Sequence, residues 1–139
     1  MLPIKNLLLP MCLLWLLAGC ASTSDAEQEL QSQAESEEVV GKAQKKMTDN
    51  GDRAARSRDY EAAVAFYREA LRLKETAPLW LRVGFAYQGM EEARKAAGAF
   101  QKALALDAED PRGWQALGKL YLNNRQLDLA RKHYQHALM

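Results

Sequence analysis

Residues 77–110 read APLWLRVGFAYQGMEEARKAAGAFQKALALDAED, and residues 111–138 read PRGWQALGKLYLNNRQLDLARKHYQHAL. When this stretch is displaced by ~34 residues, its two halves align at positions of matching size and polarity. The aligned pairs are Trp80 with Trp114, Val83 with Leu117, Gly84 with Gly118, Tyr87 with Tyr121, Ala96 with Ala130, Phe100 with Tyr134, Ala103 with Ala137 and Leu104 with Leu138. Such a period indicates copies of one supersecondary unit that must stack on its neighbours to bury an apolar face.

The repeated residues resemble the tetratricopeptide repeat (TPR), whose pattern is Trp-x2-Leu-Gly-x2-Tyr, then Ala, then an aromatic residue. The resemblance implies an all-α fold, a short helical solenoid of about three helix-turn-helix repeats. Its core is predicted at Trp80, Gly84, Tyr87, Ala96, Phe100, Trp114, Gly118, Tyr121, Ala130 and Tyr134. Small residues suit the points where two helices cross closely, and the aromatic residues fill the wedges between helices.

A weaker copy precedes these two. Residues 60–71 match the second helix of a TPR, and Ala63, Tyr67 and Ala70 occupy the positions of Ala96, Phe100 and Ala103. Its first helix retains Gly51 but lacks the expected Trp and Tyr, as terminal repeats often do. We therefore predict a TPR domain over residues 43–139, with repeats 44–76, 77–110 and 111–139.

Local signals mark the joints between the predicted helices. Thr76 and Asp110 are candidate N-caps, each followed by a proline in the first helical turn. The dipeptides Gly89-Met90 and Asn123-Asn124 are predicted turns, and Glu91 and Glu92 are predicted at the start of a helix, where carboxylates suit the dipole.

The first 19 residues have the composition of a signal peptide. Lys5 supplies a positive charge, and residues 7–17 form an apolar run that is shorter than the ~20 residues needed to span a bilayer. The run ends in Leu17-Ala18-Gly19-Cys20, which resembles the lipobox of bacterial lipoproteins. The resemblance implies cleavage before Cys20 and a covalent lipid, with palmitate, on that residue. An ordinary secretory signal with a chance cysteine is the alternative.

The residues that follow Cys20 predict, by the same resemblance, which membrane holds the protein. Ala21 and Ser22 follow Cys20, whereas an Asp there retains lipoproteins in the inner membrane of many Gram-negative bacteria. The periplasmic face of the outer membrane is therefore the expected location, and the periplasmic face of the inner membrane is the alternative. Cys12 would leave with the signal, so the mature chain has no disulfide.

Residues 20–42 are predicted to form an acidic tether behind the lipid, either disordered or partly helical. Of the 18 acidic residues in the chain, six lie between Asp25 and Glu38, and no basic residue lies among them. All of the 19 basic residues except Lys5 follow Gly41, which gives the repeats a net charge of +6. Either both segments are solvated surfaces, or the tether folds onto a basic groove until a partner displaces it.

In TPR proteins the first helix of each repeat lines a concave groove that holds peptides or partner helices. The matching positions in this chain are Lys45, Asp52 and Arg56, then Leu81, Phe85 and Gln88, then Arg112, Gln115, Lys119 and Leu122. Such a mixture suits a segment with acidic and apolar residues. The alternative for Leu81 and Phe85 is that they pack internally.

No pattern in the sequence predicts catalysis. His133 and His136 have a spacing that could chelate a metal, but no free Cys or carboxylate motif accompanies them, and an exposed polar face is the preferred interpretation. Phosphate loops, nucleophile elbows and dinucleotide fingerprints are absent from the sequence. We expect no enzyme activity, no cofactor, no metal and no nucleic-acid partner.

The hypothesis from the sequence is a lipid-anchored periplasmic TPR adaptor that binds partner proteins of the envelope. By architecture it resembles lipoproteins that help pilus and secretion systems assemble. A scaffold or regulatory subunit for cell-wall or outer-membrane protein biogenesis enzymes is the alternative. Leu127, Leu129, Tyr134 and Leu138 are predicted to leave apolar surface exposed at the C-terminal end, which would pair with a second copy or with a partner protein.

Overall fold

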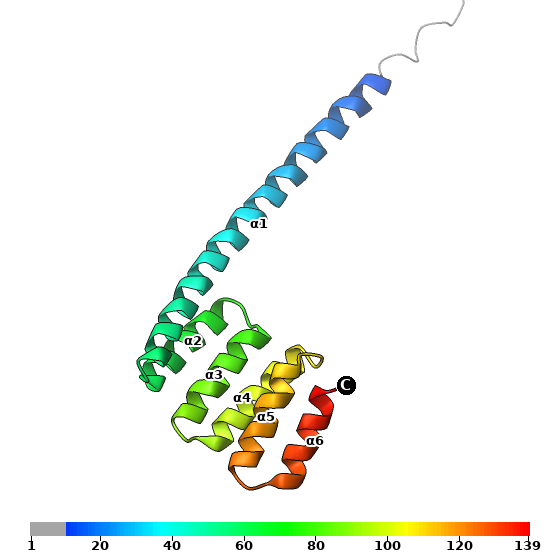
Figure 1. The fold of residues 1–139 in the computed structure, drawn as a ribbon. Coiled ribbons are helices and arrows are strands. Elements are labelled where there is room, and N and C mark those ends of the chain that lie inside the picture. The colour runs from blue at the N-terminus through cyan, green and yellow to red at the C-terminus, as the bar shows by residue number, and fades with distance from the viewer. Residues whose placement is uncertain (1–10) are drawn as a thin grey trace, which may run out of the picture. The chain divides into compact units, whose positions relative to one another are not determined.

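The computed structural model describes the backbone of residues 11–139 and the side chains of residues 25–139. Over this range it contains only helices: α1 (Met11–Arg56), α2 (Tyr60–Leu73), α3 (Ala77–Gly89), α4 (Ala93–Leu106), α5 (Pro111–Asn123) and α6 (Leu127–Ala137) (Figure 1). The predicted all-α fold is confirmed. Residues 1–10 of the predicted signal peptide, and the side chains of its other residues and of Cys20, lie outside the described part of the chain.

The chain divides into two units, Met1–Val39 and Val40–Met139. In the first unit, residues 25–39 are helical and every one of their side chains is exposed. Of the two states expected for the tether, the structure shows a helix here, because Ala, Glu and Gln favour the helix even where nothing is buried. The helices among the described residues are all too short or too polar to cross a membrane.

The second unit holds three helix pairs: residues 40–56 of α1 with α2, α3 with α4, and α5 with α6. The second helix of one pair packs on the first helix of the next, α2 on α3 and α4 on α5. The two helices of a pair can approach closely only because predicted small residues lie between them. A Cβ built on Gly51 would overlap the Tyr67 ring, and a Cβ built on Gly84 would overlap the Phe100 ring.

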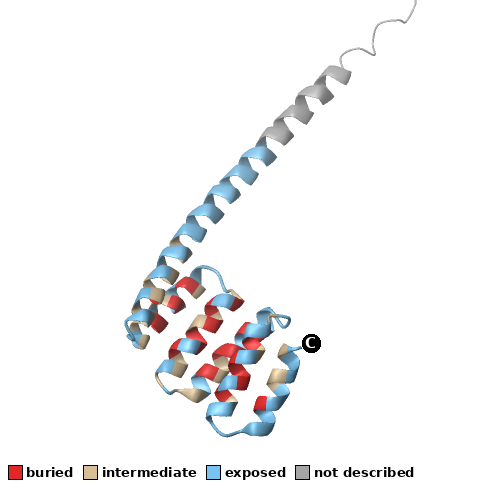
Figure 2. Cartoon of the chain, in the orientation of Figure 1, coloured by how far each residue is buried: buried red, intermediate tan, exposed pale blue. Residues whose placement is uncertain are grey.

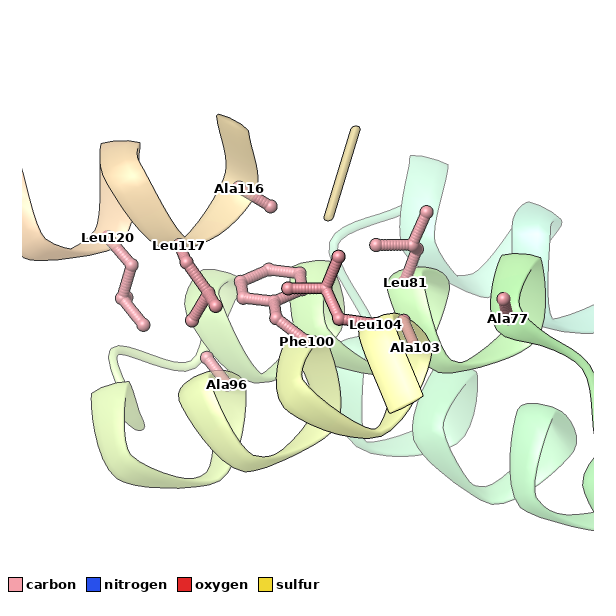
Figure 3. Packing of buried hydrophobic residues seen from close by; sticks show 9 residues of the cluster. All are labelled: Ala77, Leu81, Ala96, Phe100, Ala103, Leu104, Ala116, Leu117 and Leu120. Carbon is pink, nitrogen blue, oxygen red and sulfur yellow. The ribbon is translucent and has the colours of Figure 1, made fainter. Parts of the chain in front are cut away.

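The core is continuous across the repeats. Phe100 of α4 is fully buried and lies between Leu81 of α3 and Leu117 of α5 (Figure 3). A second cluster joins α2 to α3 through Tyr67 and Val83. Five aromatic residues of the predicted core are only partly buried: Trp80, Tyr87, Trp114, Tyr121 and Tyr134. The Trp80 indole NH donates to Glu75 Oε1 at 2.7 Å and that of Trp114 to the Ala108 carbonyl at 2.8 Å, which keeps one edge of each ring at the surface.

The turns inside the three repeats share one backbone feature. Arg58, Glu91 and Arg125 occupy equivalent places and have φ of 62°, 61° and 59°. Glu91 therefore lies in the turn and not in the helix predicted for it, and the left-handed residue after Asn123-Asn124 is Arg125. Asp110 caps α5 as predicted, by accepting from the Arg112 backbone NH at 2.9 Å. Thr76 is the N-cap residue of α3, but its side chain makes no capping hydrogen bond.

Candidate protein-binding surface

The first helices of the repeats are separated at one end by a polar cleft of about 310 Å³ between α1 and α3. We call it the α1/α3 cleft. Its walls are made by Gly41, Gln44, Lys45, Thr48, Asp49, Asp52, Thr76, Pro78, Leu79 and Arg82. Its α1 wall holds the predicted groove residue Lys45 together with Asp52.

Asp52 organises this cleft. Its Oδ1 accepts from the Tyr67 hydroxyl at 2.7 Å and from Arg82 Nε at 3.0 Å, so one carboxylate ties α1 to α2 and α3. Burial, with the bond to Asp52, raises the pKa of the Tyr67 hydroxyl well above its usual value. The hydroxyl therefore remains a hydrogen-bond donor at physiological pH. Gln44 Nε2 adds bonds to the Ala70 and Lys74 carbonyls at 3.3 and 2.5 Å.

Two cations at the α1/α3 cleft, Lys45 and Arg82, reach solvent while each pairs with an aspartate. The Lys45 ammonium pairs with Asp49 Oδ2 at 2.8 Å, and this hydrogen bond lowers the pKa of the Asp49 carboxyl. The Arg82 side chain is 40% exposed while it holds Asp52. Exposed ion pairs contribute little to stability, so Lys45 can turn to an incoming carboxylate at small cost, whereas Arg82 is also held by Asp52.

Farther along the same face, apolar side chains are exposed. Phe85 is 48% exposed, and its ring meets the Phe100 ring edge-on with centroids 5.1 Å apart. Leu122 of α5 is 47% exposed, and the neighbouring groove candidates Gln115 and Lys119 are exposed too. Together these α3 and α5 side chains offer apolar contact beside a positive charge.

Two groove predictions change with the structure. Leu81 is only 4% exposed, because it packs with Ala77, Ala116 and Leu117 between α3 and α5, so its assignment to the groove surface was wrong. Arg112 is exposed, but its guanidinium is held by Asp110 at 2.8 to 3.0 Å, which makes it part of a helix cap.

The remaining predicted positions are distributed along the face. Arg56 is exposed in the last turn of α1. Gln88 lines a separate cleft of about 410 Å³, with Leu120, Asn123 and Asn124, near the C-terminal ends of α3 and α5. The predicted set is thus a row of positions along the first helices, and not one pocket.

Arg82 was missed by the sequence reasoning. It shares one face of α3 with Pro78 and Phe85, at spacings of four and three residues, and that periodicity is the signal that could have found it. The acidic partner Asp52 could be placed from the repeat alignment, but its bonds to two other helices could not.

The two histidines lie in an aromatic stack on α5 and α6. The His133 ring is stacked on Tyr121 and Trp114, with centroids 5.1 and 5.6 Å apart, and the His136 ring is stacked on Trp114 at 4.6 Å. His133 Nδ1 is buried without a hydrogen-bond partner. Within residues 25–139, no three His, Cys, Asp or Glu side chains group in a way that could hold a metal.

Comparison with known proteins identifies the class of repeat. Models described as Tetratricopeptide repeat match residues 54–76 and 99–132. A 91-residue stretch is 30% identical to Tetratricopeptide repeat protein 37 of Xenopus laevis, and it spans 65% of this chain but only 6% of that protein. The chain therefore carries tetratricopeptide repeats, a class that typically forms non-enzymatic protein-binding scaffolds.

Solved structures agree with this fold. The TPR domain of Arabidopsis OM64 is similar with a TM-score of 0.67 and 22% identity over 71% of this chain and 83% of that one. The type III secretion translocator chaperone SycD of Yersinia enterocolitica gives 0.66 and 18% over 69% and 74%. The second TPR of Spaghetti (RPAP3), solved with the HSP90 peptide SRMEEVD, gives 0.65 and 18% over 73% and 96%. At these identities the likeness establishes the fold.

Proposed function

We propose that this protein is a lipid-anchored adaptor of the bacterial cell envelope, which uses the α1, α3 and α5 face of its TPR array to hold a segment of a partner protein. The observation that carries the proposal is that face itself. It combines the exposed Lys45 and the partly exposed Arg82, each paired with an aspartate at the α1/α3 cleft, with the half-exposed Phe85 and Leu122. An extended or helical segment with acidic and apolar residues is complementary to this surface.

The peptide bound to one structural relative supports an acidic segment as the partner. The RPAP3 TPR is solved with SRMEEVD, a short peptide with three acidic residues. By analogy, acidic side chains of the partner would meet Lys45 and Arg82, and apolar ones would cover Phe85. Assembly of a pilus or a secretion system is the process we propose for the complex, because envelope lipoproteins of this architecture resemble assembly factors of such systems.

Membrane attachment rests on the sequence Leu17-Ala18-Gly19-Cys20. Acyl chains on Cys20 would hold the mature protein at the periplasmic face of the outer membrane, since each buried methylene contributes ~0.8 kcal/mol. Metabolic labelling with a radioactive fatty acid should label the wild-type protein but not the Cys20→Ala variant. If Cys20→Ala is labelled equally, lipid attachment at this residue is wrong.

The partner is best identified by photocrosslinking in the native envelope. A photoreactive residue in place of Leu122 should link a partner that the same residue in place of Arg68, which is exposed on α2, does not link. Lys45→Ala with Arg82→Ala should weaken that link, whereas Arg68→Ala should not. Equal links from both positions would contradict binding at this face.

Self-association belongs to the same proposal, because α6 exposes apolar side chains away from this face. Two copies of the chain would pair through α6.

A further inference from the structure

The contact between α2 and α3 and the contact between α4 and α5 are equivalent joints of the array. At both joints the second helix of one repeat packs on the first helix of the next. The repeat alignment places Tyr60 of α2 at the position of Ala93 of α4, and Gly89 of α3 at the position of Asn123 of α5. The two joints therefore have matching helices but differ in the side chains between them.

At the α2/α3 joint, the Tyr60 ring fills the space between the helices. A Cβ built on Gly89 would lie 2.5 Å from Tyr60 Cζ, so the ring lies directly on the Gly89 backbone. A cleft of about 470 Å³ remains at this joint, and Tyr60 is one of its walls, together with residues of the two turns. Ala86 of α3, deeper in the joint, is 3% exposed and does not line the cleft.

At the α4/α5 joint, the equivalent space is open. Ala93 carries no ring, and two clefts of about 410 and 560 Å³ meet here, since Ala93, Leu120 and Asn124 line both. Leu120 occupies the position of Ala86, so the opening extends to a depth that Tyr60 closes at the other joint. The turns on either side are exposed or half-buried (Figure 2). We call the two clefts together the α4/α5 cleft, and their volumes lie in the range of ~300–1,000 Å³ that is typical of ligand sites.

The lining of the α4/α5 cleft combines apolar contact with uncharged polar groups. Ala93 and Leu120 supply the apolar contact. Five amide side chains surround them: Gln88, Gln101, Asn123, Asn124 and Gln126. Asn124 Nδ2 donates to the Leu120 carbonyl at 2.9 Å, so its Oδ1 is the atom that can accept from a ligand. Among the described lining residues the charged ones are Glu91 and Arg94, of opposite sign and both exposed, so a neutral side chain with an apolar body and a polar tip suits this cleft best.

We infer that the α4/α5 cleft receives a tyrosine side chain of the partner protein, which fills this joint as Tyr60 fills the preceding one. The ring would lie on Ala93 and cover Leu120. Because Asn123 carries a Cβ where Gly89 has none, the ring would lie beside Asn123, with its hydroxyl among the amide side chains. A buried tyrosine contributes a large apolar area and usually finds a hydrogen-bond partner for its hydroxyl, and such residues carry much of the affinity of an interface.

The α4/α5 cleft opens onto the binding face of the proposed function. Gln88 belongs to its lining and follows Phe85 by three residues, so both lie on one side of α3. A partner segment that covers Phe85 therefore reaches the cleft with its next residues. This inference rests on the proposed function for the origin of the ring, but it requires neither the lipid nor the cations Lys45 and Arg82.

Titration with N-acetyl-tyrosinamide tests the cleft without a partner. The ligand is added to a chain of residues 21–139, which keeps the whole compact unit Val40–Met139. It should shift the backbone amide NMR signals of Ala93, Leu120 and Asn124 with a Kd of about 1 mM, as expected of so small a ligand. N-acetyl-leucinamide, which lacks the ring and the hydroxyl, should bind several-fold more weakly. The absence of saturable shifts at these signals, or equal binding of the leucine compound, would overturn the inference.

The double variant Ala93→Tyr/Asn123→Gly copies the α2/α3 joint into the α4/α5 joint. Its own ring then fills the cleft, so N-acetyl-tyrosinamide should no longer shift the Leu120 and Asn124 signals. Ala105→Tyr is the matched control, because Ala105 is exposed on the same helix and outside the lining of the cleft, and this variant should bind as the wild type does. Undiminished binding by the double variant, with circular dichroism showing it folded, would contradict the site.

The photocrosslink from position 122 tests whether the ring belongs to the partner. In the native envelope, Ala93→Tyr/Asn123→Gly should weaken this link, whereas Ala105→Tyr should not. A link of unchanged strength in the double variant would overturn the assignment of the ring to the partner. Lys45→Ala with Arg82→Ala should leave the binding of N-acetyl-tyrosinamide unchanged, so a failure of the proposed function and a failure of the α4/α5 cleft give different results.

Discussion

At the scale of single residues, the glycines of the repeats divide into those that meet a neighbouring side chain and one that meets nothing. A Cβ on Gly84 would overlap the Phe100 ring, whereas a Cβ on Gly98 of α4 would have no atom within 4 Å. Gly84→Ala should therefore lower the free energy of unfolding by ~1–3 kcal/mol through overpacking. Gly98→Ala should raise it by ~0.5–1 kcal/mol, because Ala loses less backbone entropy in a helix.

Urea denaturation of both variants measures these opposite signs. The pair controls for helix propensity, since both changes place Ala inside a helix. A stabilising Gly84→Ala would mean that the α3 and α4 crossing can open to accept a methyl group.

A second single-residue prediction concerns the left-handed turn residue before α6. Arg125 has φ of 59°, a conformation that costs a residue with a Cβ ~1–2 kcal/mol. Arg125→Gly removes that strain but adds entropy to the unfolded chain, so we expect a net stabilisation of ~0.5–1 kcal/mol. Gln126→Gly, at φ of −92°, has no strain to relieve and should destabilise. Thermal unfolding midpoints that fall in both variants would argue against strain at Arg125.

The residue scale also shows where sequence reasoning succeeds. Gly84, Ala96, Phe100 and Ala130 were predicted as core residues from the repeat alone, and all are buried. Leu81 was assigned to the surface because the alignment gives a position along the helix but not the depth of the groove between α3 and α5. Arg82 was missed for the related reason that its bond to Asp52 joins helices 30 residues apart.

At the scale of one element, α6 is predicted to lose stability in acid. Burial lowers the pKa of His133, and the neighbouring charges of His136 and Lys132 lower it further. As the pH falls below the ordinary histidine pKa of ~6.5, the unfolded chain binds a proton before the folded one does. The free energy of unfolding therefore falls with decreasing pH, and the loss is complete below the lowered pKa.

Denaturation at a series of pH values between about 7 and 5 spans the ordinary histidine pKa and measures this loss. His133→Gln should flatten the dependence. His136→Gln removes only the smaller, charge-based cause, so most of the dependence should remain. An unchanged profile in His133→Gln would place the titrating group elsewhere.

The ends of helices were predictable where the sequence carries a capping residue followed by a proline. Asp110 with Pro111 fixes the start of α5, and the Asp110 carboxylate caps it as expected. The acidic stretch carries no such signal. Its composition left disorder and a partial helix open, because it buries nothing. Its helix propensity decides for a helix over Asp25–Val39, with every side chain exposed.

At the scale of the whole molecule, a repeat array is favourable for prediction because each repeat contacts only its neighbours. The 34-residue spacing of Trp80 and Trp114 was therefore enough to predict nearly the whole fold. The binding face was less predictable, since a cleft depends on which side chains remain exposed after three helix pairs have packed.

The last prediction concerns which part of the chain folds independently. Residues 25–39 expose every side chain, and the compact unit begins at Val40. A chain of residues 40–139 should therefore unfold at the same urea concentration as a chain of residues 21–139, within the ~0.5 kcal/mol that exposed residues typically contribute. A chain of residues 48–139 is the matched control. It lacks Gln44, whose side chain bonds to the Ala70 and Lys74 carbonyls, and Met47, which packs on the cluster around Tyr67. That shorter chain should unfold at a clearly lower urea concentration. If residues 40–139 were destabilised as much as residues 48–139, the acidic helix would be contributing to the stability of the array.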